Sequence, residues 1–307
     1  MKKCKGLSLM SGGLDSQLAI KVLERAGAYV EAVTFVSPFF KDDSSCERSA
    51  ANLGVKLRRI DFTDEIVALL HSPPHGFGGA MNPCIDCHAA MIRKAGELME
   101  SLGYDFVATG EVVGQRPMSQ NRQSIGVVAK TSGLEGRLVR PLSALLLAPT
   151  KVEEEGLLDR SLLLDISGRS RERQIALAAE LGIEEYPSPA GGCRLTEEGF
   201  GRRVRDLMEH EGLGERWLVE LLSVGRRFRL SGGTSVILGR DKVENERFEA
   251  LSGKGTLLRP TGRAGASALL PSVASPAELA LAQELVEAYA KGMPAEGRER
   301  FRPFQLI

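Results

Sequence analysis

The stretch MSGGLDSQLA, residues 10–19, decides the fold of the first part of the chain. A short apolar run, Leu7–Met10, precedes it, and Gln17–Arg25 follows it with apolar residues at helical spacing. The order is therefore strand, loop, helix. Paired glycines let a backbone approach a ligand closely, and the free N–H groups at the start of a helix attract negative charge. The stretch predicts a loop that holds a phosphate.

Two common phosphate loops are excluded by what this stretch lacks. It has no lysine of the GxxxxGK type and no GxGxxG pattern. SGGLDS instead resembles the PP-loop, SGGxDS, of ATP pyrophosphatases, which adenylylate a substrate and release pyrophosphate. This resemblance implies that the loop amides and four loop residues hold the pyrophosphate of ATP, and that Asp15 is catalytic and helps to place Mg2+. The four residues are Ser11, Gly12, Gly13 and Ser16. An ordinary glycine-rich turn is the structural alternative.

Length and composition bound the class of protein. At 307 residues and 43% hydrophobic content, the chain is long enough for two domains. No apolar run approaches the roughly 20 residues of a membrane span, and no secretory signal core is visible, so we expect a cytoplasmic protein without membrane partners. Lys plus Arg balances Asp plus Glu at 40 each, so any nucleic-acid surface must be local. Five cysteines, an odd number, favour metal or sulfur chemistry over disulfides.

Short apolar runs alternate with helical segments along the first half of the chain. Strands are expected at 28–37, 56–62 and 104–111, and helices at 44–53 and 88–102. This alternation predicts an α/β fold with a doubly wound, mostly parallel sheet, which the resemblance makes PP-loop/HUP-like, and a smaller α+β domain after it.

Ligands of such sheets gather at the carboxyl ends of the strands. We therefore expect adenine beside Val33, Thr34 and Phe35 at the end of the second strand. The resemblance also places TGEVVGQRP, residues 109–117, near the nucleotide, with Gly110 among the residues that bind it. Arg116 in this loop is predicted to meet phosphate or RNA, and a solvated arginine is the alternative.

A second signal is the pair of cysteines in NPCIDCHAAM, residues 82–91. Cys84 and Cys87 lie at the start of a helix, where the helix dipole is predicted to lower a thiol pKa. A CxxC pair by itself allows four interpretations: a redox pair, half of a zinc site, part of an iron–sulfur site, or two buried thiols without a task.

Cys193, in the Gly-rich stretch YPSPAGGCRLT at 186–196, completes a trio with Cys84 and Cys87. Structural zinc prefers four ligands, and His88 is awkwardly placed directly after Cys87, so three thiolates favour a four-iron, four-sulfur cluster. PP-loop tRNA thiolation enzymes are similar to this chain in bringing an NPC-type cysteine and a later cysteine to the ATP site. That resemblance implies either a sulfur-handling pair, Cys193 with Cys84 or Cys87, or all three as cluster ligands.

Two basic stretches are candidates for RNA contact. GRSRERQ, residues 168–174, contains Arg169 and Arg171 and is predicted to face RNA or phosphate, although Glu172 at a helix start offers a structural alternative. The helix that follows is expected to turn Ile175 inward. Further on, RRFRL at 226–230 and TSVILG at 234–239 predict a hairpin whose strand is basic through Arg226 and Arg227, both predicted to bind RNA.

The segments at 237–251 and 277–292 resemble the NFACT-R RNA-binding domain. Together the two resemblances predict a PP-loop domain at 1–192, a helical linker at 193–219 and an NFACT-R-like domain at 220–307. They imply an AMP-forming tRNA sulfurtransferase of the 2-thiouridine-forming type, which adenylylates a base carbonyl with ATP. Its partners are tRNA and a sulfur donor, either inorganic sulfide or a persulfide carrier.

Two other functions stay open from the sequence. One is a PP-loop enzyme that acts on a small molecule. The other is a non-catalytic RNA-binding protein whose cysteines hold a structural metal.

Overall fold

The computed structural model describes residues 4–41, 44–188 and 193–306, and the chain divides into two compact units, residues 1–194 and 195–307. The segment 193–219, expected as a helical linker, contains α8 (Glu198–His210) and most of α9 (Arg216–Glu220), and both helices belong to the second unit. Among the described residues, no helix is long and apolar enough to cross a membrane.

The first unit is built on a five-stranded parallel sheet in the order β3-β2-β1-β4-β5. Its strands are β1 (Lys5–Leu9), β2 (Tyr29–Val36), β3 (Leu57–Asp61), β4 (Phe106–Ala108) and β5 (Leu138–Val139). Its helices are α1 (Leu14–Arg25), α2 (Ser45–Leu53), α3 (Thr63–His71), α4 (Cys84–Ser101), α5 (Arg122–Ser132), α6 (Lys151–Glu154) and α7 (Glu172–Glu180). The predicted doubly wound α/β fold is confirmed.

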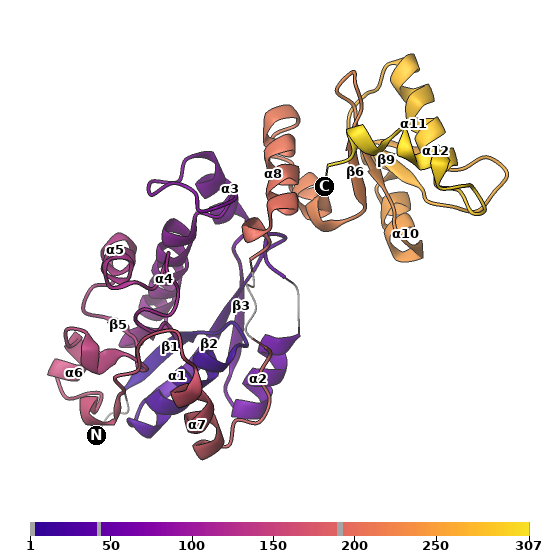
Figure 1. The fold of residues 1–307 in the computed structure, drawn as a ribbon. Coiled ribbons are helices and arrows are strands. Elements are labelled where there is room, and N and C mark those ends of the chain that lie inside the picture. Colours follow the sequence, from indigo (N-terminus) through magenta and orange to yellow (C-terminus); the bar gives the residue numbers. More distant parts are fainter. Residues whose placement is uncertain (1–3, 42–43, 189–192, 307) are drawn as a thin grey trace. The chain divides into compact units, whose positions relative to one another are not determined.

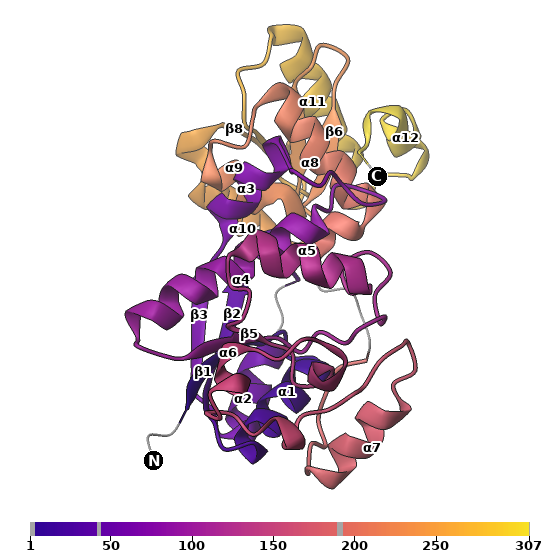
Figure 2. The same cartoon turned by 90° about the vertical axis from the view of Figure 1, so that its left-hand side faces the viewer.

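Helices cover both faces of this sheet. Figures 1 and 2 show α1, α2 and α7 on one side of the strands and α4 and α5 on the other. Alternate strand residues supply the two cores: Phe106 and Ala108 pack toward α1, whereas Leu7 and Val107 pack toward α4. Gly6 is required within β1, because a Cβ there would lie 2.3 Å from the ring of Phe106.

The strand order places a ligand crevice between β1 and β4. The chain runs from β1 outward through β2 and β3 and then returns to β4 on the other side of β1. Ligands of open α/β sheets bind at this switch point, beyond the carboxyl ends of the strands. The loop of residues 10–13 after β1 and the loop beginning at Thr109 after β4 both leave the sheet there.

The second unit is a four-stranded antiparallel sheet in the order β6-β7-β9-β8 with helices on both faces (Figure 1). Its strands are β6 (Arg226–Arg229), β7 (Ser235–Leu238), β8 (Thr256–Leu258) and β9 (Ala268–Leu270), and its remaining helices are α10 (Lys242–Ala250), α11 (Pro276–Ala288) and α12 (Glu296–Glu299). The predicted β6–β7 hairpin is confirmed, with Arg229 opposite Ser235.

Helix α8 is fastened to the hairpin of this unit by ion pairs. The guanidinium of Arg229 in β6 contacts Asp206 of α8 at 2.5 Å and Glu211, just after α8, at 2.6 Å. Burial opposes the charge, but both carboxylates together raise the pKa of Arg229. These paired charges explain why α8 packs as part of the second unit.

Candidate functional site

The loop after β1 has the geometry of an anion cradle. Gly12 has a φ of +75°, and a side chain there would lie 2.2 Å from the hydroxyl of Ser45. A Cβ at Gly13 would meet only Ser11 Oγ, at 3.5 Å, so the space over the helix start is open. Ser16 Oγ donates to the Gly13 carbonyl at 2.7 Å and fixes the turn. Helix α1 therefore presents its first N–H groups to a ligand.

Asp15 is held at the edge of this loop with one oxygen unused. Gln115 Nε2 donates to Asp15 Oδ2 at 2.8 Å, whereas Asp15 Oδ1 is buried and has no hydrogen-bond partner in the part of the chain that the structure describes. Gly110 permits this approach, because a Cβ there would lie 2.6 Å from the Asp15 carbonyl oxygen. An unpaired carboxylate oxygen beside a phosphate cradle fits the oxygen ligands that Mg2+ prefers.

The segment before α7 lies against the loop after β4, which carries Gln115. Ser167 bridges Val113, and the Gly168 N–H donates to the Val113 carbonyl at 2.8 Å, two residues before Gln115. Arg171 Nε is buried and has no hydrogen-bond acceptor within residues 4–41, 44–188 and 193–306. A buried N–H without an acceptor is costly unless a ligand or water supplies one. This arrangement favours phosphate as the partner of Arg171.

Sequence reasoning missed Gln174 in the first turn of α7. Its side chain is fully buried, and neither amide atom has a partner among the described residues. The expectation for Ile175 was wrong: it is 51% exposed, because Gln174, Leu177 and Ala178 form the buried face of α7. Hydrophobicity alone predicts that the isoleucine is the buried residue. A buried glutamine without hydrogen-bond partners is explained better by ligand binding than by packing.

The residues expected around adenine lie at the end of β2, next to β1. The Met10 N–H donates to the Val33 carbonyl at 2.8 Å, and Thr34 Oγ1 contacts Cys46 Sγ at 3.4 Å. The Phe35 ring packs against the Phe62 ring, with 5.0 Å between the two ring centres. The structure thus brings the expected adenine residues beside the phosphate cradle, while the nucleotide contact itself stays a prediction.

The three thiols of the predicted trio gather near the carboxyl edge of the sheet. Cys84 and Cys87 lie in the first turn of α4, and Cys84 Sγ accepts from Asn82 Nδ2 at 3.1 Å. Cys193 forms an antiparallel bridge with Phe40, in the segment that follows β2. Burial raises the pKa of Cys87, and the neighbouring Cys193 and Cys84 raise it further. Cys193 and Cys84 therefore lie within electrostatic range of Cys87.

This raised pKa corrects the expectation of an acidic thiol at the helix start. Cys87 is 8% exposed, so the loss of hydration outweighs the favourable helix dipole. Burial also raises the pKa of Cys4 to about 11, in keeping with a packing thiol.

The three thiols agree with a four-iron, four-sulfur cluster in number and ligand softness. The residues that the structure describes nevertheless contain no group of three or more His, Cys, Asp or Glu side chains arranged to hold a metal ion. The described positions of the three thiols therefore do not form a preformed ligand set.

A buried network behind the crevice was not anticipated from the sequence. Glu111, after β4, contacts Arg140 Nε at 2.8 Å and His88 Nδ1 at 3.1 Å, and it accepts from Thr109 Oγ1 at 3.1 Å. Burial would raise the pKa of Glu111, but Arg140 and His88 lower it to about 2. The network joins the residue after Cys87 to the loop after β4 and so fixes the relative position of the two.

The predicted RNA-contacting arginines have different surroundings. Arg116 and Arg169 are exposed, and neither has an ion-pair partner in the described ranges. In the second unit Arg226 is half-buried, whereas Arg227 is only 1% exposed. The guanidinium of Arg227 is buried, and its Nε and Nη2 have no hydrogen-bond partner among the described residues, so its contact with RNA stays a prediction.

Two family models match the chain. Residues 2–146 match the model described as thiamine biosynthesis protein (ThiI), and residues 225–299 match the NFACT protein RNA binding domain.

Curated relatives are similar to parts of the chain. A tRNA-specific 2-thiouridylase MnmA 1 of Syntrophus aciditrophicus is 24% identical over 68% of this chain and 56% of its own length. A probable tRNA sulfurtransferase of Lysinibacillus sphaericus is 25% identical over 45% of this chain and 34% of its own length. The chain thus spans between about a third and about a half of these relatives.

A solved complex of a 4-thiouridine synthetase with RNA and bound ATP is 21% identical, with a TM-score of 0.38, over 59% of this chain and 52% of that one. The phosphate cradle at residues 10–16 and the CxxC pair both lie within the first matched segment, and the basic hairpin opens the second. The part of the chain that carries the cradle and the CxxC pair is therefore similar to the ThiI family, and the part that carries the hairpin is similar to the NFACT RNA binding domain.

Proposed function

We propose that this chain is an ATP-dependent tRNA sulfurtransferase. A base carbonyl oxygen attacks the α-phosphate of ATP, pyrophosphate leaves, and the adenylylated base then exchanges its C–O bond to AMP for a C–S bond. The observation that carries the proposal is the placement of Cys84 and Cys87 at the start of α4 and of Cys193 against Phe40, at the sheet edge that holds the phosphate cradle. The similarity to proteins named tRNA thiouridylase and tRNA sulfurtransferase supports it.

The first step uses the loop after β1. Its N–H groups, with Ser11, Gly12, Gly13 and Ser16, bind the departing pyrophosphate, and preorganised donors of this kind stabilise developing charge. Asp15 contributes its unpaired Oδ1 to Mg2+, which when bound neutralises phosphate charge.

Around this step, Arg171 and Gln174 supply further donors to the phosphates, while Val33, Thr34, Phe35 and Gly110 line the nucleotide.

The second step uses the thiols. A persulfide on one cysteine of a pair, Cys193 with Cys84 or Cys87, attacks the activated carbon and displaces AMP, forming a base–S–S–cysteine link. The partner thiolate then attacks the cysteine sulfur of that link, so the thiocarbonyl is released and the pair becomes a disulfide. Inorganic sulfide supplies the next sulfur by attacking this disulfide, which becomes one cysteine persulfide and one thiol. Alternatively, a thiol reductant reduces the disulfide, and a persulfide carrier then transfers its outer sulfur to the freed cysteine thiolate.

An iron–sulfur cluster on Cys84, Cys87 and Cys193 is the alternative arrangement of the same thiols, and it would supply an open iron for sulfur. Iron and sulfide analysis after anaerobic purification separates the two arrangements. Loss of iron on Cys193→Ala supports the cluster, and an iron-free protein that still forms thionucleoside supports the pair.

RNA is held by the second unit together with exposed arginines of the first. We propose Arg116, Arg169 and Arg226 as RNA contacts, with 1–192 as the catalytic domain, 220–307 as the RNA-binding domain and 193–219 between them. The tRNA substrate places the proposed reaction in the cytoplasm.

The test compares tRNA with small molecules as acceptor. We expect pyrophosphate release to rise when tRNA is added, and thionucleosides to appear in the digested tRNA when sulfide is supplied. The thiamine biosynthesis label of the matched family favours a small-molecule acceptor as the second candidate. Pyrophosphate release that ignores tRNA, with no thionucleoside formed, would decide for that candidate.

A further inference from the structure

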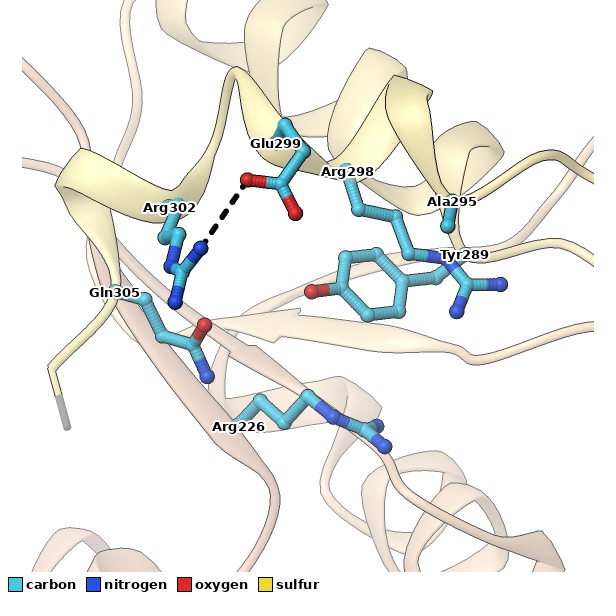
Figure 3. A pocket seen from close by; sticks show the side chains of 7 residues that line it. All are labelled: Arg226, Tyr289, Ala295, Arg298, Glu299, Arg302 and Gln305. Atoms are coloured by element: carbon cyan, nitrogen blue, oxygen red, sulfur yellow. Dashed lines mark hydrogen bonds and ion pairs between the residues drawn. The ribbon is translucent and has the colours of Figure 1, made fainter.

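A cationic pocket of about 310 Å3 lies in the second unit. Side chains from four segments surround it, and they are Arg226, Tyr289, Ala295, Arg298, Glu299, Arg302 and Gln305. Figure 3 shows the Tyr289 hydroxyl aimed toward the side that carries Arg302 and Gln305, with Arg226 on the β6 side. A space of this volume accommodates a single nucleotide-sized ligand.

Two of its arginines are held in place without being neutralised. The guanidiniums of Arg226 and Arg298 lie 5.5 and 4.9 Å from the centre of the Tyr289 ring. Arg298 Nε also donates to the Ala288 carbonyl at 3.1 Å. Neither guanidinium has a carboxylate partner among the described residues. The ring and the backbone carbonyl therefore orient the charges and leave N–H groups for an anion.

The other polar groups of the pocket also offer donors. Within the described residues, neither the Tyr289 hydroxyl nor the Gln305 side-chain amide has a hydrogen-bond partner. Glu299 is the one carboxylate in the lining, and it is paired with Arg302 at 3.4 Å. The lining thus carries a net charge of +2, from three arginines and one glutamate, and several free donors.

The structure assigns to this pocket the binding of one unpaired, phosphate-bearing nucleotide of an RNA strand. The phosphate lies between Arg226 and Arg298, whose planar guanidiniums suit its oxygens, and the Tyr289 hydroxyl and Gln305 amide meet the ribose or base edge. The inference deepens the proposed function, and it rests on that part of it in which the second unit holds RNA.

The test measures binding of the full chain to a fluorescein-labelled tRNA transcript at several salt concentrations. For Arg226→Gln and Arg298→Gln we expect affinity to fall about tenfold each, since each loses a charge-assisted contact. The slope of log affinity against log salt should decrease by about one for each variant. Arg300→Gln is the matched control, because Arg300 follows α12 directly but pairs with Glu284 outside the pocket.

Tyr289→Phe keeps the ring and removes only the hydroxyl, so a smaller loss with an unchanged salt slope is expected. Competition with AMP tests whether the pocket binds a nucleotide within RNA or a free nucleotide. Displacement of tRNA by micromolar AMP would overturn the RNA assignment. Equal losses in Arg226→Gln, Arg298→Gln and Arg300→Gln would overturn the pocket assignment.

The readouts keep the two proposals apart. Pocket-dependent tRNA binding without any thionucleoside would sustain this inference and refute the proposed reaction. Thionucleoside formation with tRNA binding that ignores Arg226 and Arg298 would refute the inference alone.

Discussion

Two sets of buried polar groups lie side by side at the carboxyl edge of the parallel sheet, and they differ in how their hydrogen bonds are met. Behind the crevice, Glu111 is fully used by Arg140, His88 and Thr109. At the start of α1, Asp15 Oδ1 has no partner in the described chain, and neither has the Gln174 amide of α7, a helix that packs against α1. The paired groups around Glu111 stabilise the fold. The unpaired groups are expected to gain hydrogen-bond partners when a ligand binds.

The largest effect is expected from breaking the paired groups around Glu111. Arg140→Ala leaves the buried carboxylate of Glu111 without its main counter-charge, and the free energy of unfolding should fall by about 3–5 kcal/mol. Urea denaturation followed by circular dichroism measures it. Arg173→Ala, which removes an exposed ion pair with Asp165, is the control and should leave the free energy of unfolding almost unchanged. Equal losses in both variants would contradict the distinction.

Acidification should weaken the same Glu111 network without a mutation, because it protonates the carboxylate. The pKa of Glu111 is lowered from 4.5 to about 2 in the folded chain. A lowered folded pKa contributes stability above the unfolded pKa, and this contribution, about 3 kcal/mol, is lost as the pH falls from about 5 to 2. Denaturation midpoints across that range measure the loss. In Glu111→Gln this component of the pH dependence should be missing, and its persistence there would assign it to other groups.

Asp15→Asn tests whether the unpaired polar groups near the phosphate cradle serve a ligand. The change keeps the hydrogen-bonding shape but removes the charge proposed to meet Mg2+, so we expect pyrophosphate release to slow by about a hundredfold. Unfolding stability should stay near that of the unaltered chain, which separates a chemical effect from a folding effect. A rate near that of the unaltered chain would remove Asp15 from the proposed machinery.

A smaller effect of opposite sign is expected at Gln174. Gln174→Leu replaces an unpaired buried amide with an apolar group of similar volume, and the ligand-free chain should gain about 1 kcal/mol of stability. The same variant should bind ATP more weakly, as measured by calorimetric titration. The exposed neighbour gives the control, Ile175→Gln, which should change neither quantity. Weaker stability with unaltered ATP binding would make Gln174 a packing residue.

The sequence predicted the parts of the fold that rest on local patterns. SGGLDS between an apolar run and a helical run identified β1, the cradle and α1, and the turn between Arg226–Leu230 and Thr234–Gly239 identified the hairpin. Strand β5 was missed, because two residues between polar neighbours carry no visible period.

The errors concern properties that depend on tertiary burial. A cysteine at a helix start suggests a lowered pKa, but the packing around Cys87 reverses the direction. Arg227 reads as a surface residue of a basic strand, and only the structure shows that its side chain is 1% exposed. The Glu111 network joins His88, Glu111 and Arg140 across 52 residues of sequence, so no local pattern could indicate it.

The central claim is that thiols brought together beside the ATP loop carry sulfur to the base that ATP activates. The most direct measurement follows pyrophosphate release and thionucleoside formation in parallel, with ATP, tRNA and sulfide, for the unaltered chain, Cys193→Ala and the packing-thiol control Cys4→Ala. The account predicts that Cys193→Ala still releases pyrophosphate but forms no thionucleoside, while Cys4→Ala does both. Thionucleoside formation by Cys193→Ala at the rate of the unaltered chain would contradict it.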